Sequence, residues 1–159
     1  MQATVEYMIL IPVLILQIFL FPMFVNVAMN QWITNRQTVE LQQTASNLGS
    51  IIEQTYLSLN HTSILGCKFT SNLSFQPKIE GYTYSGSATL QSVSHSRTGA
   101  SQVLSVTLSF VGKQISTTTS VTLGQNVKWV NSQFTSNPPT GSLVAQKFAN
   151  QTIQLSFKS

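Results

Sequence analysis

The stretch VEYMILIPVLILQIFLFPMFVNVAM, residues 5–29, decides the architecture of this chain of 159 residues. Its one charged residue is Glu6, and Ile, Leu, Val, Phe and Met make up most of the rest. A run of this length and composition is long enough to cross a bilayer as a helix. No Lys or Arg precedes it and no small-residue cleavage site follows it, so we expect an apolar helix that belongs to the working protein rather than a secretory signal.

The remainder of the chain is polar but carries little charge. Only 8% of the residues are charged, whereas globular domains average about 25%. The roughly 100 residues beyond a long N-terminal helix leave room for one small globular domain, and a multi-domain enzyme is not expected. The cations are scattered singly, which favours solvated surface positions over a nucleic-acid patch. They are Arg36, Lys68, Lys78, Arg97, Lys113, Lys128, Lys147 and Lys158.

The helix is predicted to continue well past the apolar run. Apolar residues recur at spacings of three and four, which places them in one helical stripe; they are Leu41, Ala45, Leu48, Ile52, Tyr56 and Leu59. We therefore predict one helix over 1–59, with an apolar segment at 1–30 and an amphipathic half at 31–59 that packs on a globular domain formed by 60–159.

The globular domain is predicted to be built from strands. Leu104, Val106, Leu108 and Phe110 alternate with Ser and Thr, Gly112-Lys113 turns the chain, and alternation resumes from Ile115 to Leu123, which predicts a hairpin with one buried face. Further strands are expected at Lys68 to Phe75, Lys78 to Tyr84, Ala88 to Ser94, Val127 to Val130 and Thr152 to Phe157, and a loop at 137–141. The fold class is therefore α+β, a long helix followed by an antiparallel, immunoglobulin-like β-sandwich.

Few residues are available for chemistry. The single cysteine, Cys67, is expected to be a small buried hydrophobe. His61 and His95 are expected in loops and on the surface, and Glu80 at the start of a strand, with no metal-ligand spacing among them. No phosphate-binding loop or nucleophile motif is present, so catalysis and a cofactor are not expected.

Three N-x-S/T sequons begin at Asn60, Asn72 and Asn150. A chain so rich in Ser and Thr contains some by chance, and their placement next to predicted loops carries more weight than their number. We expect at least one of them to carry a glycan.

The head of the apolar run contains a short motif. Gln2, Thr4, Glu6 and Leu10 stand in the frame QATVEYMIL, which resembles the class III leader motif Q-x-S-x-E-x-x-x-L of archaeal type IV pilins, with Thr4 in place of Ser. The resemblance implies that a prepilin peptidase removes a basic leader at this motif and that a pilus assembly machinery takes up the subunit. If cleavage precedes Gln2, Glu6 becomes the fifth residue, where many pilins carry an acidic side chain.

The need of Glu6 for a partner also follows from physical chemistry alone. A carboxylate inside a membrane-spanning helix asks for a partner. Arg36, the nearest cation in sequence, lies about 45 Å away along a continuous helix, which excludes it. The remaining partners are headgroup water and a positive group of a neighbouring subunit, such as its N-terminal amine. Alternatively, Glu6 simply marks the membrane edge and has no specific partner.

Two prolines, Pro12 and Pro22, lie inside the apolar helix, where neighbouring helices can satisfy the carbonyl groups they free. Pro22 resembles a proline that is common at this place in pilins, although proline is frequent in membrane helices generally. With Glu6, we assign these prolines and four apolar residues to assembly between subunits; the four are Leu10, Leu14, Phe19 and Phe21.

The sequence thus favours a pilin that is stored in the cytoplasmic membrane and polymerises with copies of itself into an extracellular filament for adhesion or cell contact. The membrane, the peptidase, the assembly machinery and N-glycans are its expected partners. Two alternatives stay open. One is a monomeric surface-binding domain tethered by a membrane helix, and the other is an archaellum filament subunit.

Overall fold

The computed structural model describes residues 2–64, 66–72, 76–95, 99–130, 132–137 and 141–158, with side chains from residue 8 onward except at 72, 93–95 and 99–100. The chain divides into two compact units, Met1–Arg36 and Gln37–Ser159. The division falls within the helix, after the apolar segment and before the amphipathic stripe.

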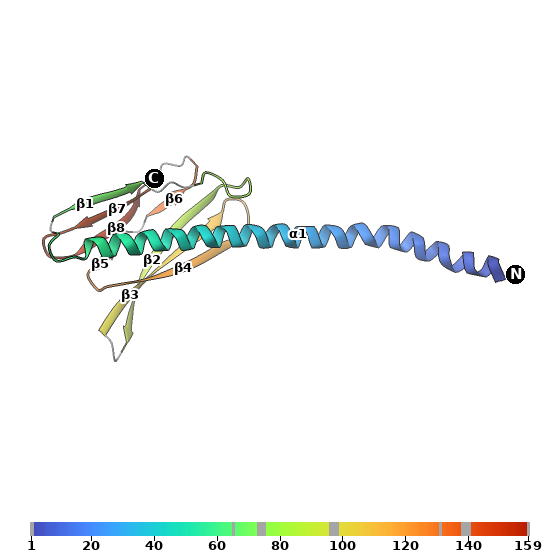
Figure 1. The fold of residues 1–159 in the computed structure, drawn as a ribbon, viewed down its shortest axis with the longest axis horizontal. Coiled ribbons are helices and arrows are strands. Elements are labelled where there is room, and N and C mark those ends of the chain that lie inside the picture. Colours follow the sequence, from blue (N-terminus) through green and yellow to red (C-terminus); the bar gives the residue numbers. More distant parts are fainter. Residues whose placement is uncertain are drawn as a thin grey trace. The chain divides into compact units, whose positions relative to one another are not determined.

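One α-helix, α1, runs over Gln2–Leu59 (Figure 1). The predicted long N-terminal helix is confirmed. Pro12 and Pro22 both lie inside it. The helix ends where Asn60 donates its backbone N–H to the Tyr56 carbonyl oxygen at 2.8 Å, after which a turn at 60–63 redirects the chain.

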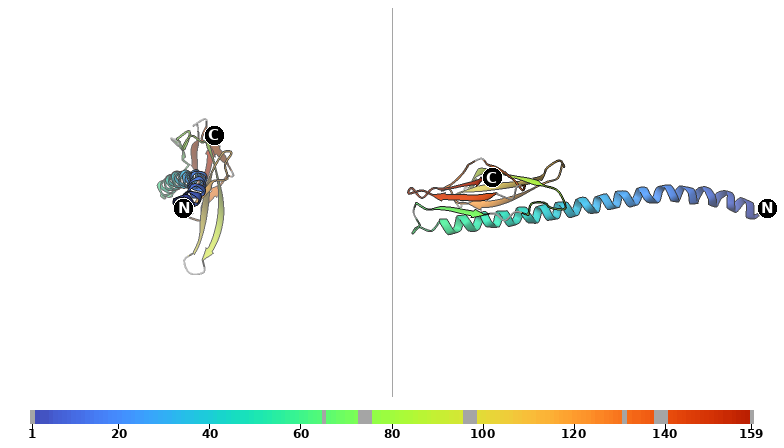
Figure 2. Two further views of the ribbon diagram at one scale, coloured as in Figure 1. Left: turned by 90° about the vertical axis from the view of Figure 1, so that its right-hand side faces the viewer. Right: turned by 90° about the horizontal axis from the view of Figure 1, so that it is seen from above.

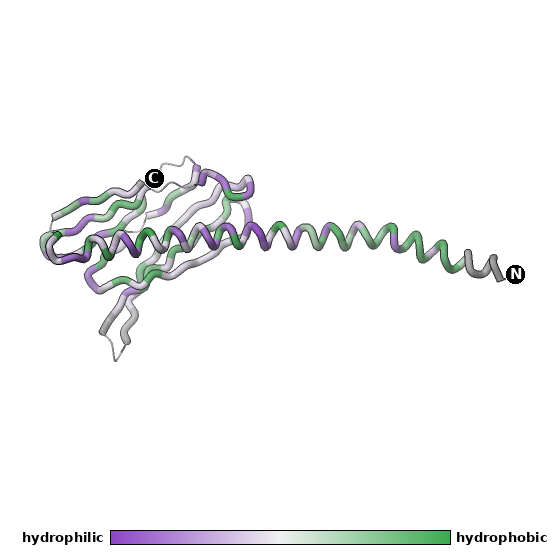
Figure 3. Tube along the Cα trace, in the orientation of Figure 1, coloured by the Kyte–Doolittle hydropathy of each residue, from purple (hydrophilic) through white to green (hydrophobic). Residues whose placement is uncertain are grey.

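The first unit consists of the N-terminal part of α1, and apolar side chains project on all sides of this helix up to Met29. Figure 3 shows the change in hydropathy along the helix, from a mostly hydrophobic segment to one in which polar residues alternate with apolar ones. Every large apolar side chain from Met8 to Ile33 is exposed within this chain. Since successive helical residues are about 100° apart, such a run covers the whole circumference of the helix.

The second unit contains two four-stranded sheets (Figures 1 and 2). The first has the order β1 (Lys68–Asn72), β7 (Ser142–Lys147), β8 (Ile153–Lys158) and β5 (Val127–Trp129), and the second has the order β4 (Ser116–Leu123), β3 (Gly99–Phe110), β2 (Tyr84–His95) and β6 (Gln133–Thr135). Strands β5 and β8 pair in parallel, and the other paired strands are antiparallel.

The amphipathic half of α1 joins the core of this unit. The predicted stripe is buried at every position: Leu41, Ala45, Leu48, Ile52, Tyr56 and Leu59. Gly49 lies on the same side, and a Cβ at this position would stand 3.1 Å from Cγ2 of Val121 on β4. The absence of a side chain at Gly49 therefore lets the helix backbone approach the sheet closely.

Aromatic residues link the two sheets. Phe134 on β6 and Phe157 on β8 meet edge to face with ring centroids 4.9 Å apart, and Trp129 on β5 contacts Phe157 at the same distance. Gly86 on β2 leaves room for the Phe134 ring, because a Cβ there would lie 2.2 Å from a ring carbon. The sheets and α1 thus share one hydrophobic core.

The predicted hairpin is confirmed, with β3 and β4 paired in register from Gln102–Leu123 to Ser109–Ser116. The strand predicted at Lys78 to Tyr84 is wrong. Ile79 and Tyr82 form an isolated bridge around Glu80 and Gly81, whose φ angles are 49° and 82°. Positive φ at both central residues is typical of a type I′ turn, so Glu80 lies in a turn and not at a strand start.

The other boundaries differ by small amounts. Strand β1 begins at Lys68 as predicted and is described up to Asn72, while residues 73–75 of that prediction lie outside the described residues. Strand β2 begins at Tyr84 rather than Ala88. Strands β6 and β7 were not expected, and residues 138–140 of the predicted loop lie outside the description.

Candidate assembly surface on helix α1

The apolar segment of α1 offers a continuous hydrophobic surface. Four of its predicted assembly residues have exposed fractions of one half or more: Leu10 53%, Leu14 50%, Phe19 75% and Phe21 71%. Removing one such side chain from water stabilises an assembly by about 1.5 to 3 kcal/mol. A surface of this extent requires a lipid or protein environment.

In the described part of the chain, α1 is the one helix long and apolar enough to cross a membrane. None of its most apolar stretch of 18 residues is buried in the structure. Length and composition make it compatible with membrane insertion, as an anchor or as a signal sequence.

The residues of the N-terminal motif are described only in part. Gln2, Thr4 and Glu6 lie in α1, but their side chains are outside the described residues. The predicted roles of Glu6 in assembly and of the motif in processing therefore stay predictions. Leu10 is the one member of the motif whose side chain is described, and it is exposed.

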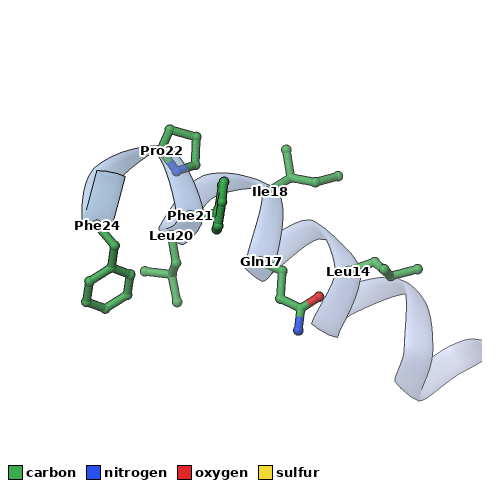
Figure 4. A pocket seen from close by; sticks show the side chains of 7 residues that line it. All are labelled: Leu14, Gln17, Ile18, Leu20, Phe21, Pro22 and Phe24. Atoms are coloured by element: carbon green, nitrogen blue, oxygen red, sulfur yellow. The ribbon is translucent and has the colours of Figure 1, made fainter. Parts of the chain in front are cut away.

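A shallow apolar groove runs along the middle of this segment (Figure 4). Leu14, Ile18, Phe21 and Phe24 line it, with Leu20, Pro22 and the amide of Gln17. Pro22 has no N–H to donate to the carbonyl of Ile18, so this turn of α1 has one backbone donor and one backbone hydrogen bond fewer. The groove is a place where an apolar side chain of another helix can insert.

A polar boundary follows the apolar segment. The guanidinium carbon of Arg36 lies 5.8 Å from the centroid of the Trp32 ring, a cation–π contact at the end of the first unit. Trp and Arg are side chains that favour the membrane–water interface. Sequence reasoning missed this pair, although the spacing of four residues in a helix is the signal that identifies it.

The second unit begins with a polar anchor. Lys113, in the turn between β3 and β4, donates from Nζ to Oε1 of Gln37 at 3.0 Å and stands 3.7 Å from the centroid of the Tyr82 ring. Gln37 is itself buried. The turn therefore holds the first turn of the packed half of α1, which makes Lys113 more than the solvated cation predicted from the sequence.

The outward face of the second sheet is built from hydroxyl groups. Alternation along β2, β3 and β4 turns one set of residues, among them Leu104, Leu108 and Val121, to the core and leaves a band of Ser and Thr residues on the opposite face. Oγ of Ser85 and Ser109 lie 3.1 Å apart, and Oγ1 of Thr107 and Thr118 lie 2.9 Å apart. The rows read Ser85–Ser109–Ser116, Ser87–Thr107–Thr118 and Thr89–Ser105–Ser120. This face is polar without being charged.

Two of the three sequons lie close together. Nδ2 of Asn126 donates to Oδ1 of Asn60 at 2.9 Å and to the carbonyl of Gln151 at 3.1 Å. Oδ1 of Asn150 accepts from the backbone N–H of Thr152 at 3.2 Å. Both sequon asparagines are exposed, and both engage only their oxygen atoms in these bonds. The Asn72 side chain lies outside the description.

The expected burial of two single residues is wrong. Cys67 is exposed rather than buried, because it lies just before β1 in the segment that leaves the turn after α1. Lys147 is 1% exposed, whereas a solvated position was expected; its Nζ donates to the carbonyl of His61 at 2.7 Å. A buried ammonium group needs such an acceptor.

Neither histidine belongs to a group of potential metal ligands among the described residues. His61 is exposed in the turn after α1, and His95 ends strand β2, where a loop was expected; its side chain is not described. Among the residues with described positions, no three His, Cys, Asp or Glu side chains gather as metal ligands would.

Comparison with protein-family models, with curated proteins and with solved structures found no match to this chain.

Proposed function

We propose that this protein is the structural subunit of an extracellular filament of the archaeal type IV pilus kind, and that copies of it polymerise through the apolar segment of α1. The observation that carries the proposal is the exposure of every large apolar side chain from Met8 to Ile33, on all sides of the helix. A helix that anchors a monomer needs only lipid around it. A filament needs a surface that can be covered by copies from several directions, and this helix provides one.

The membrane and the filament are alternative environments for the same surface. In the bilayer the side chains contact lipid tails, and in the fibre they contact the same segment of neighbouring copies. Burial in either place removes the same area from water, at about 25 cal/mol per Å² of apolar surface. Transfer from one to the other is therefore governed by packing and polar contacts rather than by the hydrophobic effect.

The second unit would then form the outer surface of the fibre. We propose that its two sheets constitute an immunoglobulin-like sandwich, a proposal supported by the aromatic contact between Phe134 on one sheet and Phe157 on the other. The uncharged hydroxyl face of β2, β3 and β4 suits a surface exposed to the environment and available for adhesion or cell contact.

Glu6 provides a direct test of the assembly role. Glu6→Ala is expected to reduce filament yield strongly while the protein still fractionates with membranes, because the carboxylate pairs with a neighbouring subunit and the apolar run is retained. Glu53 is a matched control, since it is an exposed Glu of α1 in the second unit, and Glu53→Ala is expected to assemble normally. Normal filaments from Glu6→Ala would remove the proposed role.

Two other functions compete with this proposal. A monomeric binding domain tethered by α1 predicts that the chain stays in the membrane fraction and forms no fibres. An archaellum subunit predicts fibres that rotate and drive swimming. The start of this chain lacks the Gly- and Ala-rich composition associated with archaellins, which favours an adhesive pilus.

We also propose that the globular unit carries N-glycans at Asn60 and Asn150. Both are exposed, and in both the amide nitrogen, which is the atom that an N-glycan occupies, makes no hydrogen bond to the described residues. The hydrogen bonds that Asn126 and Thr152 make to the oxygen atoms persist when the nitrogen is modified. Glycans at these two positions would emerge side by side.

A further inference from the structure

Two side-chain amides interrupt the apolar run of α1 between Met8 and Met29. Gln17 and Asn26 are both exposed and flanked by apolar residues in sequence. Neither amide has a hydrogen-bond partner among the residues that the structure describes. Gln17 is also the one polar side chain that lines the groove of Figure 4.

Such amides are costly wherever this segment is buried. An amide moved from water to an apolar environment without a hydrogen bond loses free energy, whether lipid or protein surrounds it. The amide of a glutamine or asparagine both donates and accepts, so two amides can satisfy each other. In membrane helices, contacts between polar side chains of this kind join neighbouring helices.

The spacing between the two amides decides which contact they can make. Nine residues of α-helix span about two and a half turns and about 13.5 Å, which places Gln17 and Asn26 on opposite faces. One helix therefore cannot satisfy both residues itself, and a symmetric pair would bring Gln17 to Gln17 and leave Asn26 alone. A contact between opposite faces is heterologous, and repeated it generates an open helical array rather than a closed dimer.

We propose that, in the assembled filament, the Gln17 amide of each copy hydrogen-bonds to the Asn26 amide of a parallel neighbour displaced by about 13.5 Å along the helix axis. This pair fixes the axial register that apolar contacts alone leave free to slide. The proposal rests on the proposed function, because it requires the apolar segments of several copies to pack together.

Cysteine cross-linking tests the pair. In a Cys67→Ser background, filaments are assembled from Gln17→Cys chains, from Asn26→Cys chains, and from an equal mixture of the two, and are then oxidised. The mixture is expected to give disulfide-linked dimers, and each variant alone is expected to give none. Cross-links in filaments of Gln17→Cys alone, or no cross-links in well-formed mixed filaments, would overturn the pair while leaving the filament proposal standing.

Leucine substitutions provide a second test that does not depend on disulfide geometry. Gln17→Leu alone and Asn26→Leu alone each leave one buried amide unpaired, whereas the double substitution leaves none. We expect each single variant to lower the ratio of filament to membrane-bound subunit about tenfold, and the double variant to recover most of it. A double variant as impaired as the product of the two singles would contradict the pairing. Absence of filaments from the unmodified chain would instead contradict the proposed function itself.

Discussion

Nζ of Lys147 lies 2.7 Å from the carbonyl oxygen of His61, although 86 residues separate them in the chain. Lys147 ends strand β7 and is 1% exposed, while His61 belongs to the turn that follows α1. The backbone N–H of Lys147 also donates to the carbonyl of Cys67 at 2.8 Å. One residue thus ties the end of the helix to the first sheet, and a cation near a helix C-terminus is favoured by the helix dipole.

Lys147→Ala is expected to destabilise the globular unit by about 2 to 4 kcal/mol, because it removes a charged hydrogen bond to a carbonyl and leaves a cavity. Urea unfolding of the detergent-solubilised chain measures the change. Lys128→Ala is the matched control, since Lys128 is an exposed lysine on β5, and its effect should stay within about 0.5 kcal/mol. Equal effects of the two substitutions would show that Lys147 carries no special role.

Gly86→Ala is expected to cost about 1 to 3 kcal/mol, because the new methyl group would overlap the Phe134 ring, 2.2 Å from the Cβ position. Phe134→Leu in the same chain shortens the obstructing side chain. The double variant should therefore lose less stability than the sum of the two single variants. Thermal unfolding of the four proteins gives the comparison, and strictly additive losses would argue against this contact.

Burial raises the pKa of Tyr84 from 10.0 to about 12. The unfolded chain therefore releases this proton first, and the stabilising contribution, fully present below pH 10, is lost as the pH rises towards 12. A shift of this size corresponds to a loss of about 2 to 3 kcal/mol across that interval. Tyr84→Phe should show a shallower decline in unfolding free energy between pH 9.5 and about 11.5 than the parent. Identical slopes would contradict the assignment.

Intact mass of the protein from a glycosylating archaeal host tests the proposed sites. Thr62→Ala and Thr152→Ala destroy the sequons of Asn60 and Asn150 without touching either asparagine, and each should remove one glycan mass. Thr62→Ser and Thr152→Ser preserve the sequons and should leave the mass increment unchanged. A bare mass for the parent, in cells that modify a reference glycoprotein, would refute both sites.

Helical periodicity predicted more of this fold than strand patterning did. The stripe from Leu41 to Leu59 is correct at each position because a helix on a sheet buries one face at fixed spacing. The β3–β4 hairpin was predictable because apolar and polar residues alternate with a period of two along strands that bury one face. Strand β7 was not, because its last buried residue is Lys147, whose burial depends on an acceptor supplied by the distant turn at His61.

Local backbone conformation accounts for the false strand. Residues 78–84 contain Ile79, Tyr82 and Tyr84, which are residue types common in strands, but Glu80 and Gly81 adopt positive φ and fold the segment into a tight turn. Glycine permits this conformation, whereas a glutamate rarely adopts it, so the pattern of residue types gave no warning.

The candidate assembly surface also combines features that the sequence predicts with features that it does not. The apolar surface of α1 was predictable from composition, since no globular core could cover so long a run. The contact of Arg36 with Trp32 and the hydroxyl rows across β2, β3 and β4 depend on helical spacing and on strand register. The Arg36–Trp32 contact could be predicted from the sequence, whereas the hydroxyl rows could be predicted only once the pairing of the strands was known.

Electron microscopy of material sheared from cells that produce this chain, with mass spectrometry of the same fraction, tests whether the chain polymerises into an extracellular filament. We expect fibres in which this chain is the main component, with the apolar segments of α1 packed along the axis and the β-sheet units outside. Fibres that lack this chain, or a chain that remains entirely in the membrane fraction as a monomer, would contradict this expectation.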